Sequence, residues 1–332
     1  MISYLRAIKY THYGNNFIIH ICKTLHKKYR GEMKLTKKIL ILLLTLSCIS
    51  HGTGQQQQTK KMRALYIPNF KAANLSYIKQ TVEKGAPLGI NMLVIDIHKY
   101  GSRKFNAKKE VIDYLKNEGL YIVARVVCFQ DGIVKMPVAD EDIEALRQLI
   151  ASSAASGFDE VQLDYIRFSD GAAPYPLKKK YLFIESLLSD FKKIAQDNKI
   201  KLSADLFGRI VYNQNDYIGQ KVEIFTPYVD AIYPMLYPSH YTGDRLRMSS
   251  PGETVKEGTL KGLKRTEGKI AVQPYIQAFP YNIQYAKVPL AEYVLLQIQA
   301  VEETEARGWV AWNPNGDYSS VFSALEKATK KD

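Results

Sequence analysis

Several signatures of common enzyme classes are missing from this sequence of 332 residues. It contains no Gly-x-Gly-x-x-Gly turn and no phosphate-binding lysine loop, which argues against an open nucleotide-binding sheet. It also contains no Gly-x-Ser-x-Gly elbow and no Cys/His cluster with the spacing of a zinc site. Dinucleotide enzymes, serine hydrolases of the elbow type and zinc enzymes therefore have no support from sequence motifs.

Cysteine is also scarce, with Cys22, Cys48 and Cys128 as its three occurrences. Only Cys128 falls within the part of the chain that has a globular pattern, so an internal disulfide is excluded there. Cys128 ends an apolar segment, and we interpret it as a small buried hydrophobic residue.

The positive charge of the chain is unevenly placed. The net charge is +13, but the first 61 residues hold 11 Lys and Arg against one acid, Glu32. Ten of the thirteen net charges therefore precede the globular part, which is left close to neutral. A high pI of this origin does not indicate a nucleic-acid partner, and we expect none.

The N-terminal region has the pattern of an export signal. Met33 is followed by three lysines and then by the apolar run Ile39–Leu46, which is too short to span a bilayer. We interpret residues 33–48 as the signal peptide, residues 1–32 as a disordered, over-extended start, and residues 49–61 as a flexible linker.

The end of this signal, Thr45-Leu46-Ser47-Cys48, resembles a bacterial lipoprotein cleavage box, although the usual leucine lies one place early, at Leu44. The resemblance implies lipidation of Cys48, a cell-envelope location and membrane contact only through a lipid anchor. Plain secretion to the periplasm or the medium is the alternative.

Residues 62–332 alternate between short branched or aromatic runs and helical segments that end at glycine. Eight strands are predicted, each followed by a helical segment, and their length suits a single (β/α)8 barrel domain of about 250 residues. A doubly wound open sheet is the alternative fold. The predicted strands are Arg63–Pro68, Met92–His98, Tyr121–Phe129, Gly157–Phe168, Lys201–Phe207, Asp230–Tyr237, Ile270–Ala278 and Trp309–Asn313.

The fourth predicted strand has an unusual alternation. Apolar or aromatic residues face one side, and Glu160, Gln162 and Asp164 face the other. A strand between two helical segments should be buried on both faces, where a carboxylate is costly unless the site uses it. Asp164, at the C-terminal end of this strand, is therefore predicted to be a functional carboxylate.

The C-terminal ends of barrel strands form the active-site face. In this sequence these ends gather carboxylates, aromatic rings and amides, a combination that suits sugars. Cleavage of a glycosidic bond needs an acid for the leaving oxygen and a second carboxylate. The candidate substrate-binding residues are Asp96, His98, Arg167, Tyr237, His240, Tyr275, Gln277, Trp312 and Asn313.

Five segments in order are GFDEVQLDYIRF, SADLFG, VDAIYPMLYPSHY, QPYIQAFP and GWVAWNPN. With them the chain resembles, from about Arg63 to Ser323, a glycoside hydrolase family first catalogued as a bacterial domain of unknown function. The resemblance implies a (β/α)8 barrel akin to the α-amylase-like glycosidases, with Asp164 as nucleophile and Asp205 as acid/base. It implies no cofactor and no metal.

Two positions depart from the family pattern. Gln273-Pro274-Tyr275 stands where the family has Arg-Pro-Trp, and His98 stands where lysine is commoner. Both differences would alter contacts with the substrate.

Structural readings of the two carboxylates stay open at this point. Asp164 could pair with Arg167 across the strand end, and Asp205 could cap the following turn. Asp96 competes with Asp205 as the partner carboxylate, although a contact with a substrate hydroxyl suits Asp96 better.

The sequence therefore predicts an exported glycoside hydrolase that acts on a poly- or oligosaccharide through two carboxylates. One alternative is a non-catalytic surface barrel that binds glycans or protein. Another is a hydrolase with a metal held by Asp96, His98 and His240, which has fewer ligands at regular spacing than zinc sites show.

Overall fold

The computed structural model of the protein describes residues 60–99 and 101–330. The expected start, signal peptide, most of the linker and Cys48 lie outside these residues. Within the described residues, no helix is both long enough and apolar enough to cross a membrane.

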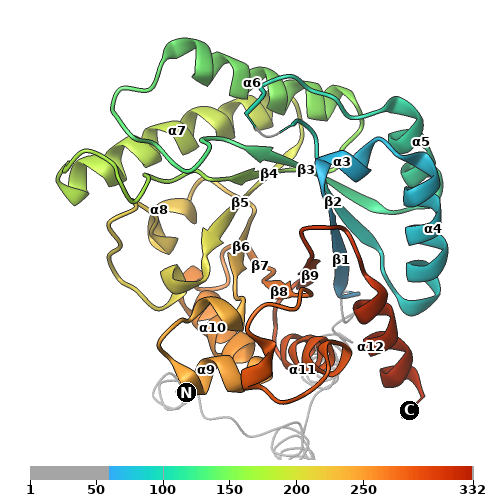
Figure 1. Ribbon diagram of the computed structural model, residues 1–332. Coiled ribbons are helices and arrows are strands. Elements are labelled where there is room, and N and C mark those ends of the chain that lie inside the picture. The colour runs from blue at the N-terminus through green and yellow to red at the C-terminus, as the bar shows by residue number, and fades with distance from the viewer. Residues whose placement is uncertain (1–59, 100, 331–332) are drawn as a thin grey trace, which may run out of the picture. The chain divides into compact units, whose positions relative to one another are not determined.

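The described residues form a closed ring of parallel strands with helices outside it (Figure 1). Strand β1 pairs with both β2 and β9, and β5 pairs with both β4 and β6, so the sheet has no free edge. The predicted (β/α)8 barrel is confirmed, and the open sheet is excluded. The strands are β1 Met62–Ile67, β2 Met92–Asp96, β3 Tyr121–Val127, β4 Glu160–Asp164, β5 Lys201–Phe207, β6 Ala231–Met235, β7 Ala271–Val272, β8 Tyr275–Gln277 and β9 Gly308–Trp312.

The seventh barrel strand is interrupted, which the sequence pattern did not predict. Strands β7 and β8 both pair with β6 and flank Gln273-Pro274. Pro274 has no N–H to donate to a neighbouring strand, so the ladder breaks there.

Helices follow the strands around the ring. They are α3 Asn69–Ala72, α4 Leu75–Gly85, α5 Lys109–Asn117, α6 Asp140–Ala155, α7 Leu177–Asp197, α8 Val222–Phe225, α9 Arg245–Ser249, α10 Pro251–Thr266, α11 Leu290–Glu302 and α12 Ser319–Thr329, with short 3-10 turns η2 Ala86–Leu88, η3 Gly208–Val211, η4 Pro238–His240 and η5 Ile283–Tyr285.

Side chains that alternate along each strand fill two separate cores. Val161 and Leu163 of β4 belong to the large core between the strands and the helices, as does Cys128 beyond β3. Glu160, Gln162 and Asp164 are buried on the opposite face of β4, inside the ring. The predicted alternation of β4 is therefore confirmed, and polar groups stand at three successive levels of the barrel interior.

The lowest of these levels is an ion-pair network around Glu160. Its Oε2 accepts hydrogen bonds from Tyr121 Oη at 2.9 Å and Arg307 Nη1 at 2.9 Å, and its Oε1 accepts one from Tyr233 Oη at 2.6 Å. Glu160 is fully buried. Since its charge has left water, these donors must replace the lost hydration, which gives Glu160 a structural role at the N-terminal end of the barrel.

We expect Arg307→Met to destabilise the fold by about 3–5 kcal/mol, because the substitution leaves Glu160 charged, buried and without its cation. Urea unfolding followed by circular dichroism measures the loss. The matched control is Lys193→Met, which breaks a surface pair with Asp197 and should leave the unfolding midpoint unchanged. A midpoint for Arg307→Met equal to that of the control would contradict the assigned role.

Candidate active site

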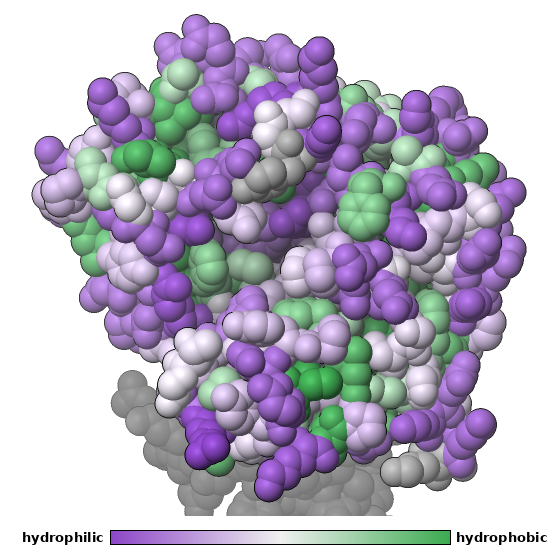
Figure 2. Space-filling model, in the orientation of Figure 1, coloured by the Kyte–Doolittle hydropathy of each residue, from purple (hydrophilic) through white to green (hydrophobic). Residues whose placement is uncertain are grey.

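A cavity of about 640 Å³ opens where the strands end. Figure 2 shows a hollow near the middle of the face viewed along the barrel, with hydrophilic residues on its walls. The cavity is lined from β3 through β9 by Arg125, Asp164, Tyr165, Asp205, Phe207, Gly208, Arg209, Met235, Tyr237, Ser239, His240, Tyr241, Thr242, Tyr275, Tyr281 and Trp312.

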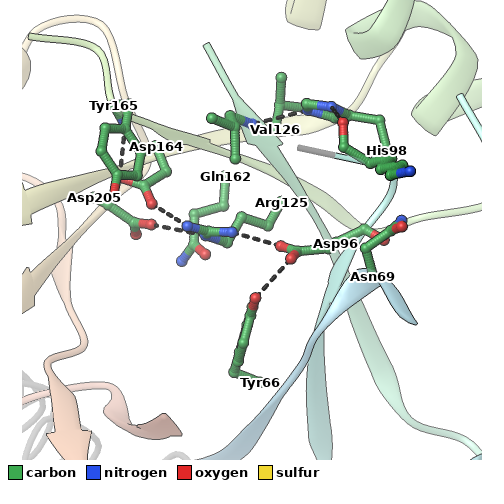
Figure 3. Close-up of polar contacts among 12 residues, drawn as sticks. Tyr66, Asn69, Asp96, His98, Arg125, Val126, Gln162, Asp164, Tyr165 and Asp205 are labelled. Atoms are coloured by element: carbon green, nitrogen blue, oxygen red, sulfur yellow. Dashed lines mark hydrogen bonds and ion pairs between the residues drawn. The ribbon is translucent and has the colours of Figure 1, made fainter. Parts of the chain in front are cut away.

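The guanidinium of Arg125 is the centre of the polar part of this cavity (Figure 3). Its Nη1 lies 2.6 Å from Asp96 Oδ1, its Nη2 pairs with Asp164 Oδ2, and its Nε lies 3.6 Å from Asp205 Oδ2. The four residues come from neighbouring strands β2 to β5, and the barrel register places Asp96 directly beside Arg125. One buried cation therefore holds three carboxyl groups at the barrel mouth.

Electrostatics keep this cation charged. Burial alone would lower the pKa of Arg125, but the charges of Asp96 and Asp164 raise it, and the net pKa lies well above the ordinary value for arginine. Tyr66 supports the arrangement from β1, since its hydroxyl donates to Asp96 Oδ2 at 2.6 Å. The Arg125 side chain is consequently fixed in position by partners on both sides.

Asp205 is the carboxyl group whose surroundings favour the protonated form. Burial raises its pKa well above the ordinary value of 3.8, and the nearby charge of Asp164 raises it further, against the opposing effect of Arg125. Its Oδ1 is buried without a hydrogen-bond partner among the described residues. A carboxyl group whose pKa is raised, next to a second carboxyl group, is an arrangement suited to acid/base chemistry.

Asp164 is held as a hydrogen-bond acceptor on both of its oxygens. Oδ2 faces Arg125, and Oδ1 accepts the backbone N–H of Tyr165 at 2.6 Å (Figure 3). Tyr165 has φ of 54°, a left-handed conformation that costs energy for a residue with a side chain. Strand β4 ends at Asp164, directly before this left-handed residue.

Aromatic rings form another wall of the site. Trp312 stacks on Tyr66 with ring centroids 5.9 Å apart and lies 5.6 Å from the ring of Tyr237, and Phe279 meets both Tyr237 and Trp312 edge-on. Burial raises the pKa of Tyr237 well above its ordinary value, with the charges of Asp205 and Asp164 adding to the effect. The phenol of Tyr237 is therefore neutral and can donate a hydrogen bond.

The structure brings six of the predicted site residues together in the cavity wall. They are Asp164, Asp205, Tyr237, His240, Tyr275 and Trp312. Asp96 reaches the same cluster through Arg125. The partner of Asp164 is Arg125, not Arg167 as the structural reading of the sequence assumed.

His98 and Arg167 lie outside the cavity wall. His98 Nε2 accepts the backbone N–H of Val127 at 3.0 Å and its Nδ1 lies 3.3 Å from the carbonyl oxygen of Lys99, so both nitrogens contact backbone (Figure 3). Arg167 Nη1 donates a hydrogen bond to the backbone carbonyl oxygen of the next residue, Phe168, at 2.8 Å. Both side chains fix the backbone beyond a strand end.

Gln277 and Asn313 also contact backbone instead of the cavity. Gln277 Nε2 donates to the carbonyl oxygens of Phe279 at 3.0 Å and Tyr281 at 2.8 Å. Asn313 Nδ2 donates to the carbonyl oxygen of Ala278 at 2.7 Å. These amides shape the loop that carries the aromatic residues Phe279 and Tyr281.

Sequence reasoning missed Arg125 and Tyr66. Arg125 lies within the apolar run Tyr-Ile-Val-Ala-Arg-Val-Val of β3. It is two residues after Val123, which points into the barrel, so its side chain lies on the same inward face of the strand. A charged residue inside an expected buried strand is a signal of the same kind as Asp164, and it could have been used.

The described residues contain no group of three His, Cys, Asp or Glu side chains that could hold a metal ion. Among the three residues of the metal hypothesis, Asp96 pairs with Arg125 and His98 turns to the backbone. The cation at the centre of the carboxyl groups is an arginine.

We expect the stability of the protein to fall as pH rises from about 4, because folded Asp205 holds a proton that the unfolded chain releases near its ordinary pKa of 3.8. Below that pH both states are protonated, and the contribution is fully present. Asp205→Asn removes this titration, so the variant should gain stability over the wild type as pH increases.

Urea unfolding between pH 4 and pH 8 measures the difference. The control is Asp190→Asn on surface helix α7, where the carboxylate pairs with Arg147. An Asp205→Asn variant whose advantage over the wild type does not grow with pH would contradict the assignment.

Comparison with solved structures finds the same fold in a spore cortex-lytic enzyme and in chitinases. The spore cortex-lytic enzyme SleL of Bacillus megaterium QM B1551 matches with a TM-score of 0.54 and 12% identity over 80% of this chain and 73% of that one. A chitinase of Chromobacterium violaceum ATCC 12472 matches with a TM-score of 0.55 and 10% identity over 81% and 99%. A mutant class V chitinase of Nicotiana tobaccum in complex with NAG4 matches with a TM-score of 0.52 and 12% identity over 80% and 98%.

No curated protein matches the chain in sequence. Residues 146–318 match the family described as "Putative glycosyl hydrolase domain". The matched region runs from α6 to the residue before α12, so it includes Asp164 and Asp205 and leaves Asp96 and Arg125 outside. It covers more than half of the sequence, and the chain therefore belongs to this family of glycosyl hydrolase domains.

Proposed function

We propose that this protein hydrolyses glycosidic bonds of a poly- or oligosaccharide by a two-carboxylate mechanism. The observation that carries the proposal is the pair Asp164 and Asp205, which share the guanidinium of Arg125 at the wall of one cavity. Membership of the glycosyl hydrolase family supports the same reaction class.

The two carboxyl groups have different roles in this proposal. Asp205, which keeps its proton because it is buried next to Asp164, donates that proton to the glycosidic oxygen as the bond to the anomeric carbon breaks. Asp164 supplies the negative charge that the anomeric carbon needs as positive charge develops there, either by attack or by electrostatic stabilisation. Water then bonds to the anomeric carbon, displacing Asp164 if it has attacked, and gives a proton back to the Asp205 carboxylate.

Arg125 maintains this division of roles. Its guanidinium contacts Asp164 more closely than Asp205, where the nearest approach is 3.6 Å. A cation stabilises the ionised form of the carboxyl group that it contacts most closely. Arg125 therefore favours charge on Asp164 and leaves the proton on Asp205.

The aromatic wall supports a sugar as the ligand. Sugar rings have apolar C–H faces that stack on aromatic rings, and Trp312 is half-buried with Tyr237 beside it in the cavity. The neutral hydroxyl of Tyr237 can donate to a sugar hydroxyl or ring oxygen. The complex with NAG4 among the structural neighbours makes N-acetylglucosamine oligomers the first substrates to screen.

We expect Asp205→Asn to reduce kcat/KM on an unactivated oligosaccharide by about 10²- to 10⁴-fold, because the leaving oxygen then receives no proton. The same variant should retain activity on a 2,4-dinitrophenyl glycoside of the same sugar, whose phenolate leaves without protonation. Asp164→Asn should lose activity on both substrates. Steady-state kinetics with the sugar found by an oligosaccharide screen measure all three effects.

Asp190→Asn serves as the surface control. An Asp164→Asn variant with full hydrolysis on either substrate rejects the role of Asp164. A wild-type protein that binds glycans and turns none over favours the non-catalytic surface barrel instead.

The proposed function includes export, on the pattern of residues 33–48. We expect the protein to be a cell-envelope lipoprotein with its lipid on Cys48, and Cys48→Ser should abolish incorporation of labelled palmitate in cells. Export of wild-type protein without any label would favour plain secretion.

A further inference from the structure

We propose that an aromatic surface beside the cavity, formed by exposed Tyr217 with half-buried Phe207 and Arg209, binds an additional sugar unit of a neutral glycan chain. We call it the Tyr217 platform. The inference rests on the proposed function and adds to it the length and charge class of the substrate, namely a neutral chain that extends beyond the cavity.

The platform is continuous with the cavity wall. Phe207 and Arg209 line the cavity, and the Arg209 guanidinium lies over both the Phe207 ring, 5.1 Å from its centroid, and the Tyr217 ring, 5.3 Å from its centroid. Tyr217 is 55% exposed although it is a large aromatic residue. The connection from β5 to α8 that carries it lies on the left of the ring in Figure 1. Aromatic surface therefore continues outward from the proposed catalytic carboxyl groups.

Hydrogen bonds hold the exposed ring in one orientation. Tyr217 Oη donates to Asp170 Oδ1 at 2.8 Å, and the backbone carbonyl oxygen of Tyr217 accepts from Lys180 Nζ at 2.8 Å. Arg209 is fixed in turn by Asp216, whose carboxylate accepts its Nε at 2.8 Å and its Nη2 at 3.2 Å. An exposed ring that is already ordered loses little conformational entropy when a ligand binds to it.

The loop is also tied directly to the proposed acid. Gln220 Nε2 donates to the backbone carbonyl oxygen of Asp205 at 3.1 Å, and Gln220 Oε1 accepts the N–H of Phe207 at 3.0 Å. The end of β5 thus holds both the Asp205 carboxyl group and the loop of the platform. This connection fixes the loop of the platform relative to Asp205.

Charge selects the class of chain. Arg209 is paired with Asp216, which is almost fully buried, and the charge of exposed Asp170 is balanced by Lys180, whose Nζ contacts the Tyr217 carbonyl oxygen. Without an excess of positive charge, the platform offers no attraction to a nucleic acid or a polyuronate. A neutral sugar can stack on the aromatic face and offer its hydroxyls to Asp170 and Arg209.

The test is a chain-length series. For oligomers of two to six units of the sugar identified by the screen, kcat/KM of the wild type should rise with length. Tyr217→Ala should remove about tenfold from the longest oligomers, the size expected for one aromatic contact, and leave the shortest unchanged. Tyr217→Phe keeps the ring and should retain most of the gain. Leu260→Ala on outer helix α10 is the surface control.

Two results would overturn the platform: a Tyr217→Ala profile equal to the wild-type profile, or an equal loss at every length. Calorimetry of the same oligomers separates the platform from the proposed hydrolysis. Protein that cleaves nothing but binds longer chains more tightly, with the gain lost in Tyr217→Ala, keeps the platform and rejects hydrolysis. Wild-type protein that neither binds nor cleaves any chain rejects both.

Discussion

The buried guanidinium of Arg125 is the constraint on which the mouth of this barrel depends. A cation removed from water must be surrounded by negative charge, and strands β2, β4 and β5 each supply a carboxyl group at the required height. Three ionised carboxyl groups would carry more negative charge than the positive charge of one arginine can balance. One of them is therefore better neutral, and burial assigns that state to Asp205. The excess of three acids over one cation therefore favours a proton on Asp205, as the proposed two-carboxylate mechanism requires.

The two ends of the barrel interior use similar groups for different purposes. At the N-terminal level, Glu160 receives hydrogen bonds from Arg307 and two tyrosines, so its charge is fully compensated. At the C-terminal level, an oxygen of Asp205 stays buried without a hydrogen-bond partner among the described residues. A saturated network stabilises the closed ring, whereas a buried oxygen without a hydrogen-bond partner costs free energy. The inward face of β4 connects the two levels, with Glu160 at its first residue and Asp164 at its last.

Polar residues outside the cavity wall position the site indirectly. Gln277 and Asn313 hold the backbone of the loop after β8, and His98 and Arg167 hold backbone at the ends of other strands. Amides and imidazoles satisfy irregular backbone that would otherwise be buried without partners. These contacts allow exposed or half-buried aromatic rings to keep fixed orientations around the cavity.

Local sequence determined the elements and their order. Alternation along β4 identified Asp164 and its inward face, and glycine-terminated helices between branched runs indicated the (β/α)8 barrel. The pairing of side chains from different strands could not be read from the sequence, because it depends on the register of the closed ring. In the structure Asp164 therefore pairs with Arg125, where Arg167 was the partner considered from the sequence, and His98 contacts backbone instead of the cavity. The pattern along one strand predicts on which face of the sheet a side chain lies. Which charged side chains pair between strands depends on the register of the closed sheet.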